Sequence, residues 1–217
     1  MTVIDTISQF LPLLLSGAWA TLYVTSLATV LALGLGLVLE LLNGSSLAPV
    51  RWMVRTYVEI MRGTPVLIVL FMLYYGGPSI GLVVDPVPAG ILGLGIYGAA
   101  YFAEIFRAGF QSIPRGQIEA GEMLGLSRTS IVLRIKIPQM LRLIIPALFG
   151  QIVMMFKESA LLSIITVSEL TKVATQIVNE TSSIIEPYIA VTVIYWVIIE
   201  AVARCGLFLE RRFSHGA

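Results

Sequence analysis

The sequence predicts an all-α integral membrane protein with about five transmembrane helices. Apolar residues make up 57% of the chain, and charged residues make up only 12%, about half the share of a soluble domain. Residues 6–39, 63–84 and 86–103 carry no charge, and two more apolar runs lie around 143–156 and 187–199. A soluble all-α protein is the alternative, but 217 residues are too few to surround five such helices with water-facing structure.

Five predicted spans follow these apolar runs, and we expect residues 1–217 to form a single transmembrane domain. The spans are 11–41, 52–76, 88–111, 140–164 and 187–209, and a polar loop at 112–138 joins the third to the fourth. The first apolar run is too long for a cleavable signal peptide, so we expect it to remain as the first span. The glycines of Leu33–Leu37 and Gly90–Gly98 lie inside spans, where small residues let helices pack closely.

Basic residues gather on one side of the predicted membrane. Eleven of the fourteen Lys and Arg residues fall in or beside the first and third connections and the C-terminal end, whereas the opposite side holds only Lys172. Positive residues stay in the cytoplasm, so we expect the N-terminus outside and both the loop 112–138 and the C-terminus inside. Topology and anionic lipid account for these basic residues, so they do not indicate binding of nucleic acid.

The sequence offers no support for covalent chemistry. It contains no Gly-rich phosphate loop, no Gly-x-Ser-x-Gly motif and no paired acids in a plausible aqueous cleft. Cys205 is the only cysteine and His215 the only histidine, which excludes an internal disulfide and a thiol-based metal site. We therefore expect no catalytic residue, no metal and no cofactor in this chain.

A polar segment, Arg115–Leu126, interrupts the apolar sequence between the third and fourth spans. Its charges and glycines are costly in hydrocarbon, so we expect a short surface helix at one face of the membrane. Ser127 can cap a second helix, which we expect to run through Ile131 and Ile135 and to end at Pro138.

Three residues of this segment suggest a docking surface. Ala120 and Gly121 are small enough for a partner to approach the backbone, and Glu119 offers a fixed charge to a basic partner residue. The alternative is a solvated amphipathic connection that lies on the lipid surface. The residues alone do not favour one over the other.

Two pairs of opposite charges lie near the predicted inner ends of the spans. Glu59 and Arg62 are three residues apart, as are Glu104 and Arg107, so each pair can form within one helix. Ionisable residues inside a membrane are costly and indicate function. We interpret both pairs as structural or gating pairs rather than as a ligand site.

A third charged group lies in the outer half of the fourth span. Lys157 and Glu158 are adjacent and point about 100° apart on a helix, so at most one of them faces a pathway squarely. We expect one of the two to contact a zwitterionic solute or to shape an outer gate, and an interhelical ion pair is the alternative. Ser168 can cap a short helix that follows, at the outer mouth.

These motifs together resemble the permeases of ATP-binding-cassette (ABC) importers, and within them the polar amino acid permease family. They occur in one order between about Leu11 and Arg212. They are Arg62-Gly63-Thr64-Pro65, Tyr101-Phe102-Ala103-Glu104 with Arg107, Arg115-Gly116-Gln117, Glu119-Ala120-Gly121, Ile137-Pro138-Gln139, Pro146 and Lys157-Glu158-Ser159-Ala160-Leu161. The family pattern has Glu-Ala-Ala, Leu-Pro-Gln and Lys-Asp-Thr-Ser-Leu at three of these motifs, and the last departure leaves the solute open.

The resemblance implies the transmembrane subunit of a type I importer in a bacterial inner membrane. Two permease subunits, identical or related, would pair with two cytoplasmic ATPase subunits, which bind ATP and Mg²⁺, and with an external solute-binding protein. The loop helix would insert into a groove on the ATPase and couple its closure to rocking of the spans. The implied coupling residues are Gln117, Glu119, Ala120, Gly121, Leu124 and Gly125.

The expected solute is a polar amino acid or a related zwitterion, with an opine or ectoine also open. The candidates for the pathway or its gate are Arg62, Thr64, Glu104, Lys157, Glu158 and Ser159. An ion-coupled secondary carrier is one rival, but five spans leave no room for the paired repeats common in those folds. A structural or regulatory membrane subunit without a pathway is the other rival.

Overall fold

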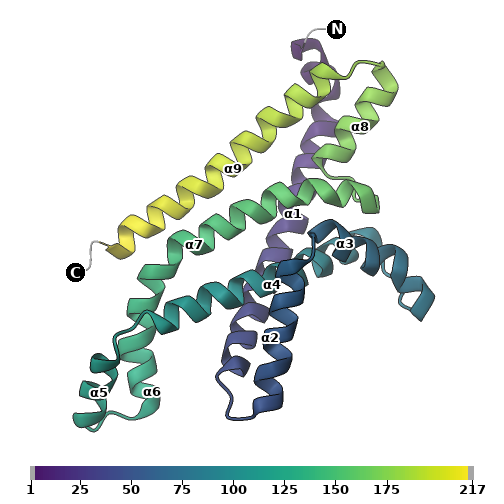
Figure 1. Cartoon of the computed structure of the whole chain (residues 1–217). Coiled ribbons are helices and arrows are strands. Elements are labelled where there is room, and N and C mark those ends of the chain that lie inside the picture. The colour runs from purple at the N-terminus through teal and green to yellow at the C-terminus, as the bar shows by residue number, and fades with distance from the viewer. Residues whose placement is uncertain (1–2, 215–217) are drawn as a thin grey trace.

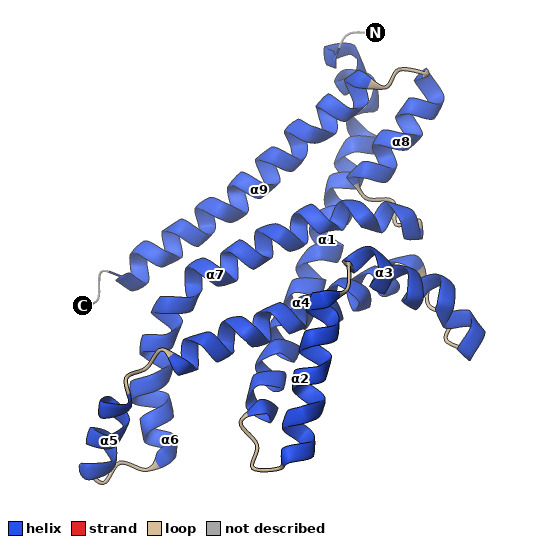
Figure 2. Cartoon of the chain, viewed as in Figure 1, coloured by secondary structure: helices blue, strands red, loops and turns tan. Residues whose placement is uncertain are grey.

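The computed structural model describes residues 3–214, and the described chain is made of helices joined by short loops, with no strand (Figure 2). The long helices are α1 (Val3–Asn43), α4 (Pro86–Gln111), α7 (Ile137–Glu158) and α9 (Ile185–Ser214). The shorter helices are α2 (Ala48–Gly63), α3 (Val66–Phe71), α5 (Arg115–Met123), α6 (Arg128–Ile131) and α8 (Leu170–Thr181). In Figure 1, α5 and α6 project together beyond the ends of α4 and α7.

Four continuous helical segments are long and apolar enough to cross a membrane: Ser8–Asn43, Pro86–Gln111, Arg128–Ile165 and Ile185–Phe213. A fifth candidate is the pair Ala48–Gly63 and Val66–Ile80, which is bent by 107°. These segments confirm the predicted fold class of an all-α membrane protein with about five spans.

The second span is broken, which differs from the single helix expected at 52–76. Pro65 has no N–H to donate, and its ring forces Thr64 out of the helical region, to φ −106° and ψ 135°. The Thr64 hydroxyl donates to the carbonyl of Ile60 at 2.8 Å, which satisfies one acceptor that the break leaves open.

The expected helix end at Pro138 is wrong, because the helix runs on from Arg128 to Ile165. A π-helical turn at Val132–Lys136 immediately precedes α7, and Pro138 lies in the first turn of α7. A proline ring clashes with the carbonyl four residues earlier, and a π turn widens the backbone at that place. The loop therefore passes into the fourth span without a break.

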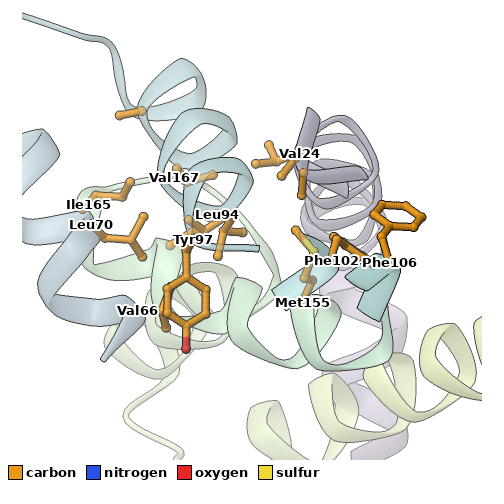
Figure 3. Packing of buried hydrophobic residues seen from close by; sticks show 14 of the residues in the cluster. Val24, Val66, Leu70, Leu94, Tyr97, Phe102, Phe106, Met155, Ile165 and Val167 are labelled. Atoms are coloured by element: carbon orange, nitrogen blue, oxygen red, sulfur yellow. The ribbon is translucent and has the colours of Figure 1, made fainter. Parts of the chain in front are cut away.

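Close packing of α1 on α4 forms the centre of the fold, as the glycine-rich stretches predict. A Cβ on Gly36 of α1 would lie 2.7 Å from the Cβ of Phe102, and one on Gly98 of α4 would lie 3.1 Å from the Cβ of Ala32. Both contacts are closer than carbon side chains normally allow. Figure 3 shows Val24 of α1 and Phe102 of α4 in a buried cluster that also includes Met155 of α7.

Candidate functional site

The loop between α4 and α7 is a compact helical hairpin made of α5 and α6. Ser127 caps α6 as predicted, since its hydroxyl oxygen accepts the N–H of Ser130 at 3.2 Å. The end of α5 is closed by Gly125 at φ +73°. The N–H of Leu126 donates to the carbonyl of Gly121 at 3.1 Å, and the N–H of Gly125 donates to the carbonyl of Glu122 at 2.9 Å. This pair of bonds is the Schellman motif, which requires a left-handed residue and favours glycine.

Gly121 faces the second half of the protein's own hairpin, the helical segment 128–136 (the α6 arm), which corrects its expected place on a docking surface. Gly121 is buried, and a Cβ there would lie 3.2 Å from both the Cγ1 of Ile131 and the Cδ1 of Ile135. The missing side chain lets α5 pack tightly on the α6 arm. This packing explains why glycine is well suited to the position where the resembling family has alanine.

The opposite side of α5 is open. Glu119 and Ala120 are exposed, and Met123 and Leu124 are 91% and 80% exposed. Within residues 3–214, Glu119 has no hydrogen bond or ion pair. An unpaired acid beside two large apolar side chains is typical of a surface that a partner covers.

Gln117 connects α5 to the beginning of α7. The Nε2 of Gln139 donates to the Oε1 of Gln117 at 2.6 Å. Both residues belong to motifs that suggested the family, and this bond gives the hairpin a direct contact with the fourth span.

Glu104 is the centre of a charged network on α4. It accepts two hydrogen bonds from Arg107, from Nε to Oε1 and from Nη2 to Oε2, each at 2.9 Å, as the spacing predicts. The internal pair expected between Glu59 and Arg62 is not formed, because Arg62 extends from α2 to Glu104 with an Nη1–Oε2 distance of 3.3 Å. The guanidinium of Arg62 also lies 5.9 Å from the ring centre of Tyr101. This contact between helices could not be found from sequence spacing.

Glu158 is half-buried, and its Oε2 is shielded from solvent and has no hydrogen-bond partner within the described chain. Lys157 is exposed. Neither residue forms an ion pair within residues 3–214, so the interhelical pair considered as the alternative is absent from that region. Ser159 is fully buried, and its hydroxyl donates to the carbonyl of Phe156 at 2.8 Å.

The cap of α8 is Glu169, which corrects the expectation for Ser168. Glu169 is 0% exposed, and its carboxylate accepts the N–H groups of Thr171 and Lys172, each at 2.8 Å, and the hydroxyl of Tyr195 at 2.7 Å. Burial raises the pKa of the Glu169 carboxyl, although these hydrogen bonds lower it. Glu169 therefore links the start of α8 to α9 and is not exposed to solvent.

Comparison with known proteins identifies the family. Residues 32–215 match the family model described as "binding-protein-dependent transport system inner membrane component". The chain belongs to this family. It is therefore a multi-pass inner-membrane component of a transport system.

Curated relatives of this permease cover nearly its whole length. A probable amino-acid ABC transporter permease of Bacillus subtilis is 35% identical over 94% of this chain and 90% of the relative. The L-cystine transport system permease of the same organism is 33% identical over 97% of this chain and 91% of the relative. The arginine transport system permease of B. subtilis is 32% identical over 94% of both chains.

Solved structures share the fold of this permease. One chain of a structure titled "Crystal structure of an amino acid ABC transporter with histidines" has a TM-score of 0.92 and 35% identity, and it covers 98% of this chain and 99% of that one. A methionine ABC transporter in an inward-facing conformation has a TM-score of 0.78 at 21% identity, over 94% of this chain and 98% of that one.

Replacement of Glu169 tests its structural role in this permease. We expect Glu169→Ala to lower the free energy of unfolding by about 3 kcal/mol, because three partly buried donors lose their acceptor. Thermal unfolding in detergent would measure the change. Glu180→Ala is the matched control, since exposed Glu180 accepts a hydrogen bond from Gln176 and from no other residue of 3–214. Equal stability of the two variants would contradict the capping role.

Proposed function

We propose that this chain is the permease subunit of an ATP-driven importer for amino acids or related zwitterions. The observation that carries the proposal is the family match over residues 32–215 together with relatives named as amino-acid permeases at up to 35% identity. The chain forms the membrane pathway, and hydrolysis of ATP, with Mg²⁺, takes place in a separate subunit. A second permease subunit and an external solute-binding protein complete the transporter.

The open side of α5 docks on the cytoplasmic ATPase. Glu119, Ala120 and Leu124 form the contact, and Gln117 transmits its movement to α7 through Gln139. Gly121 and Gly125 contribute to the structure of the hairpin and do not contact the ATPase. Gly121 sets how closely α5 packs on the α6 arm, and Gly125 ends α5. The asymmetry of basic residues supports this orientation, with the hairpin and the C-terminus in the cytoplasm and the N-terminus outside.

The solute contacts Glu158 in the outer half of the membrane. Its Oε2 is the buried carboxyl oxygen without a partner, so it can accept a hydrogen bond from the solute's ammonium group. Arg62 and Glu104 join α2 to α4 nearer the hairpin, and this ion pair serves as a gate that must rearrange when α2 moves. Thr64 stabilises the bend beside it.

Uptake in proteoliposomes tests the proposal. The permease is reconstituted with its ATPase and solute-binding protein, and uptake of radiolabelled amino acids is followed with and without ATP. We expect uptake only when ATP and the binding protein are both present. Uptake that continues without ATP and follows a sodium or proton gradient would instead support a secondary carrier. A thermal-shift screen of the binding protein would identify the solute.

A further inference from the structure

The broken second span makes polar contacts on both sides of its bend. Before the bend, Arg62 of α2 pairs with Glu104 of α4 at 3.3 Å. After the bend, the hydroxyl of Tyr75 donates to the backbone carbonyl of Ile164 at 2.8 Å. One span therefore contacts the third span through α2 and the end of the fourth span through the segment that follows α3.

The segment that Tyr75 contacts is an irregular continuation of α7. Ile164 belongs to a 3₁₀ helix, Ser159–Ile165 (η4), which follows Glu158 directly. Runs of 3₁₀ helix longer than three or four residues are uncommon, and they often mark a hinge. Figure 3 shows Ile165 of η4 in the same buried cluster as Leu70 of α3. A rearrangement of η4 would therefore change both its contact with the second span and the position of Glu158.

The residue that ends η4 has a strained backbone conformation. Thr166 lies in the left-handed region, at φ +65° and ψ 14°. The N–H of Val167 donates to the carbonyl of Leu162 at 3.2 Å, and the N–H of Thr166 donates to the carbonyl of Ser163 at 3.1 Å. This is the same Schellman motif that ends α5 at Gly125, and its left-handed position favours glycine. A β-branched residue there is an outlier, and such strain is common in segments that switch between two conformations.

The segment on the other side of the contact is irregular as well. Tyr74 and Tyr75 belong to a π-helical turn, Met72–Gly76 (η1), which follows α3 directly. Their rings pack edge to face with centres 4.9 Å apart, and the Tyr74 hydroxyl lies 3.4 Å from the Oγ1 of Thr166. Both a π turn and a long 3₁₀ run are frequent at functional sites and hinges. Two irregular segments therefore meet where the second span touches the end of the fourth.

We propose that this contact is an outer gate of the solute pathway. In Figure 1, the end of α7 that leads into η4 lies far from the hairpin of α5 and α6, and the proposed orientation places that end outside. Tyr74 and Tyr75 hold η4 in place and close the way from the outside to Glu158. The gate opens when Thr166 leaves the left-handed region, because the strain there favours release. The inference rests on the proposed function, in which an external binding protein delivers the solute.

The second span then carries one gate on each side of its bend. The bond between Tyr75 and Ile164 must break before solute enters, and the ion pair between Arg62 and Glu104 must break before solute is released. The bend of 107° at Thr64 separates the two helices that carry these contacts, so each helix can move without the other. This arrangement allows one gate to open while the other stays closed.

A reversible cross-link across the outer gate tests the proposal. Cys205, the only cysteine, is replaced by serine, and Tyr75→Cys and Ile164→Cys are introduced together. Tyr75 and Ile164 are 55% and 38% exposed, so a short bis-methanethiosulfonate reagent can reach both positions. ATP-driven uptake is measured in proteoliposomes with the ATPase and the binding protein. We expect complete cross-linking to lower uptake at least about tenfold relative to the same variant before reaction, and dithiothreitol to restore it.

Controls separate the cross-link from the chemistry of the reagent. Each single-cysteine variant should keep its uptake after the reaction. Gln176→Cys with Glu180→Cys is the matched pair, because these exposed residues lie one turn apart on α8 and do not join two segments. Its reaction should leave uptake unchanged.

Thr166→Gly tests the role of the strain. Glycine adopts the left-handed region without a Cβ clash, so the variant favours the closed gate. We expect a melting temperature no lower than that of the unmodified permease, and a maximal uptake rate at least about threefold lower. Ser182→Gly is the matched control, since Ser182 ends α8 in the same region, at φ +54°. It should leave the uptake rate unchanged.

The outcomes distinguish the gate from the transporter as a whole. Full uptake by the cross-linked permease would overturn the proposal, since a contact that stays formed throughout transport is only structural. Equal uptake rates of Thr166→Gly and Ser182→Gly would overturn release at Thr166. Either result leaves ATP-driven uptake by the unmodified transporter intact, whereas uptake that is independent of ATP would reject the proposed function itself.

Discussion

Glu119→Lys should reduce ATP-driven uptake at least about tenfold while the permease remains folded. Glu119 is exposed on the open side of α5 and has no partner within the described chain. A lysine there would place a positive charge against the basic ATPase residue that we expect Glu119 to meet, and like charges at an interface cost several kcal/mol. Uptake in proteoliposomes would measure the loss of transport, and co-purification of the ATPase with the tagged permease would measure the loss of binding.

Two variants control for different causes of this loss. Glu119→Gln keeps the shape of the side chain and should have a smaller effect, because it removes an attraction without adding a repulsion. Glu180→Lys makes the same charge reversal at α8, outside the hairpin, and should leave co-purification of the ATPase unchanged. Full uptake by Glu119→Lys would show that α5 does not couple through this charge.

Much of the fold follows from the local sequence, but the local sequence alone does not predict which proline breaks a helix. The apolar runs are enough to place five spans, because the bilayer imposes a helix of known length. Pro65 and Pro138 are equally visible in the sequence, but one breaks its span and the other does not. The difference lies in the π turn before Pro138, which depends on how the backbone relaxes there.

The candidate site likewise contains some contacts that the local sequence predicts and others that it does not. Spacing along one helix is enough to predict the Glu104–Arg107 pair and the Ser127 cap, since both are local contacts. The contacts of Arg62 and Gly121 join segments that are distant or folded back on each other, so they require the packed structure. The roles proposed for the coupling and pathway residues remain predictions, and the variants at Glu119 and Glu158 test them.

Glu158→Gln should raise the KM for uptake by about tenfold or more without lowering thermal stability. The Oε2 of Glu158 is buried without a partner, so the change to an amide removes no hydrogen bond of that oxygen within the described chain. A group that stabilised the fold would lower the melting temperature when replaced, whereas a group that binds solute should affect uptake alone. The two measurements together therefore distinguish the roles.

Lys157→Gln is the matched control for this prediction, because it changes the charge of the adjacent residue in the same helical turn. Lys157 is exposed and points about 100° away from Glu158, so its replacement should change KM by less than about twofold. If both variants raised KM equally, the general charge at the C-terminal end of α7 would be responsible and not a contact at Glu158. If only Lys157→Gln raised it, the solute would contact the other member of the pair, through its carboxylate.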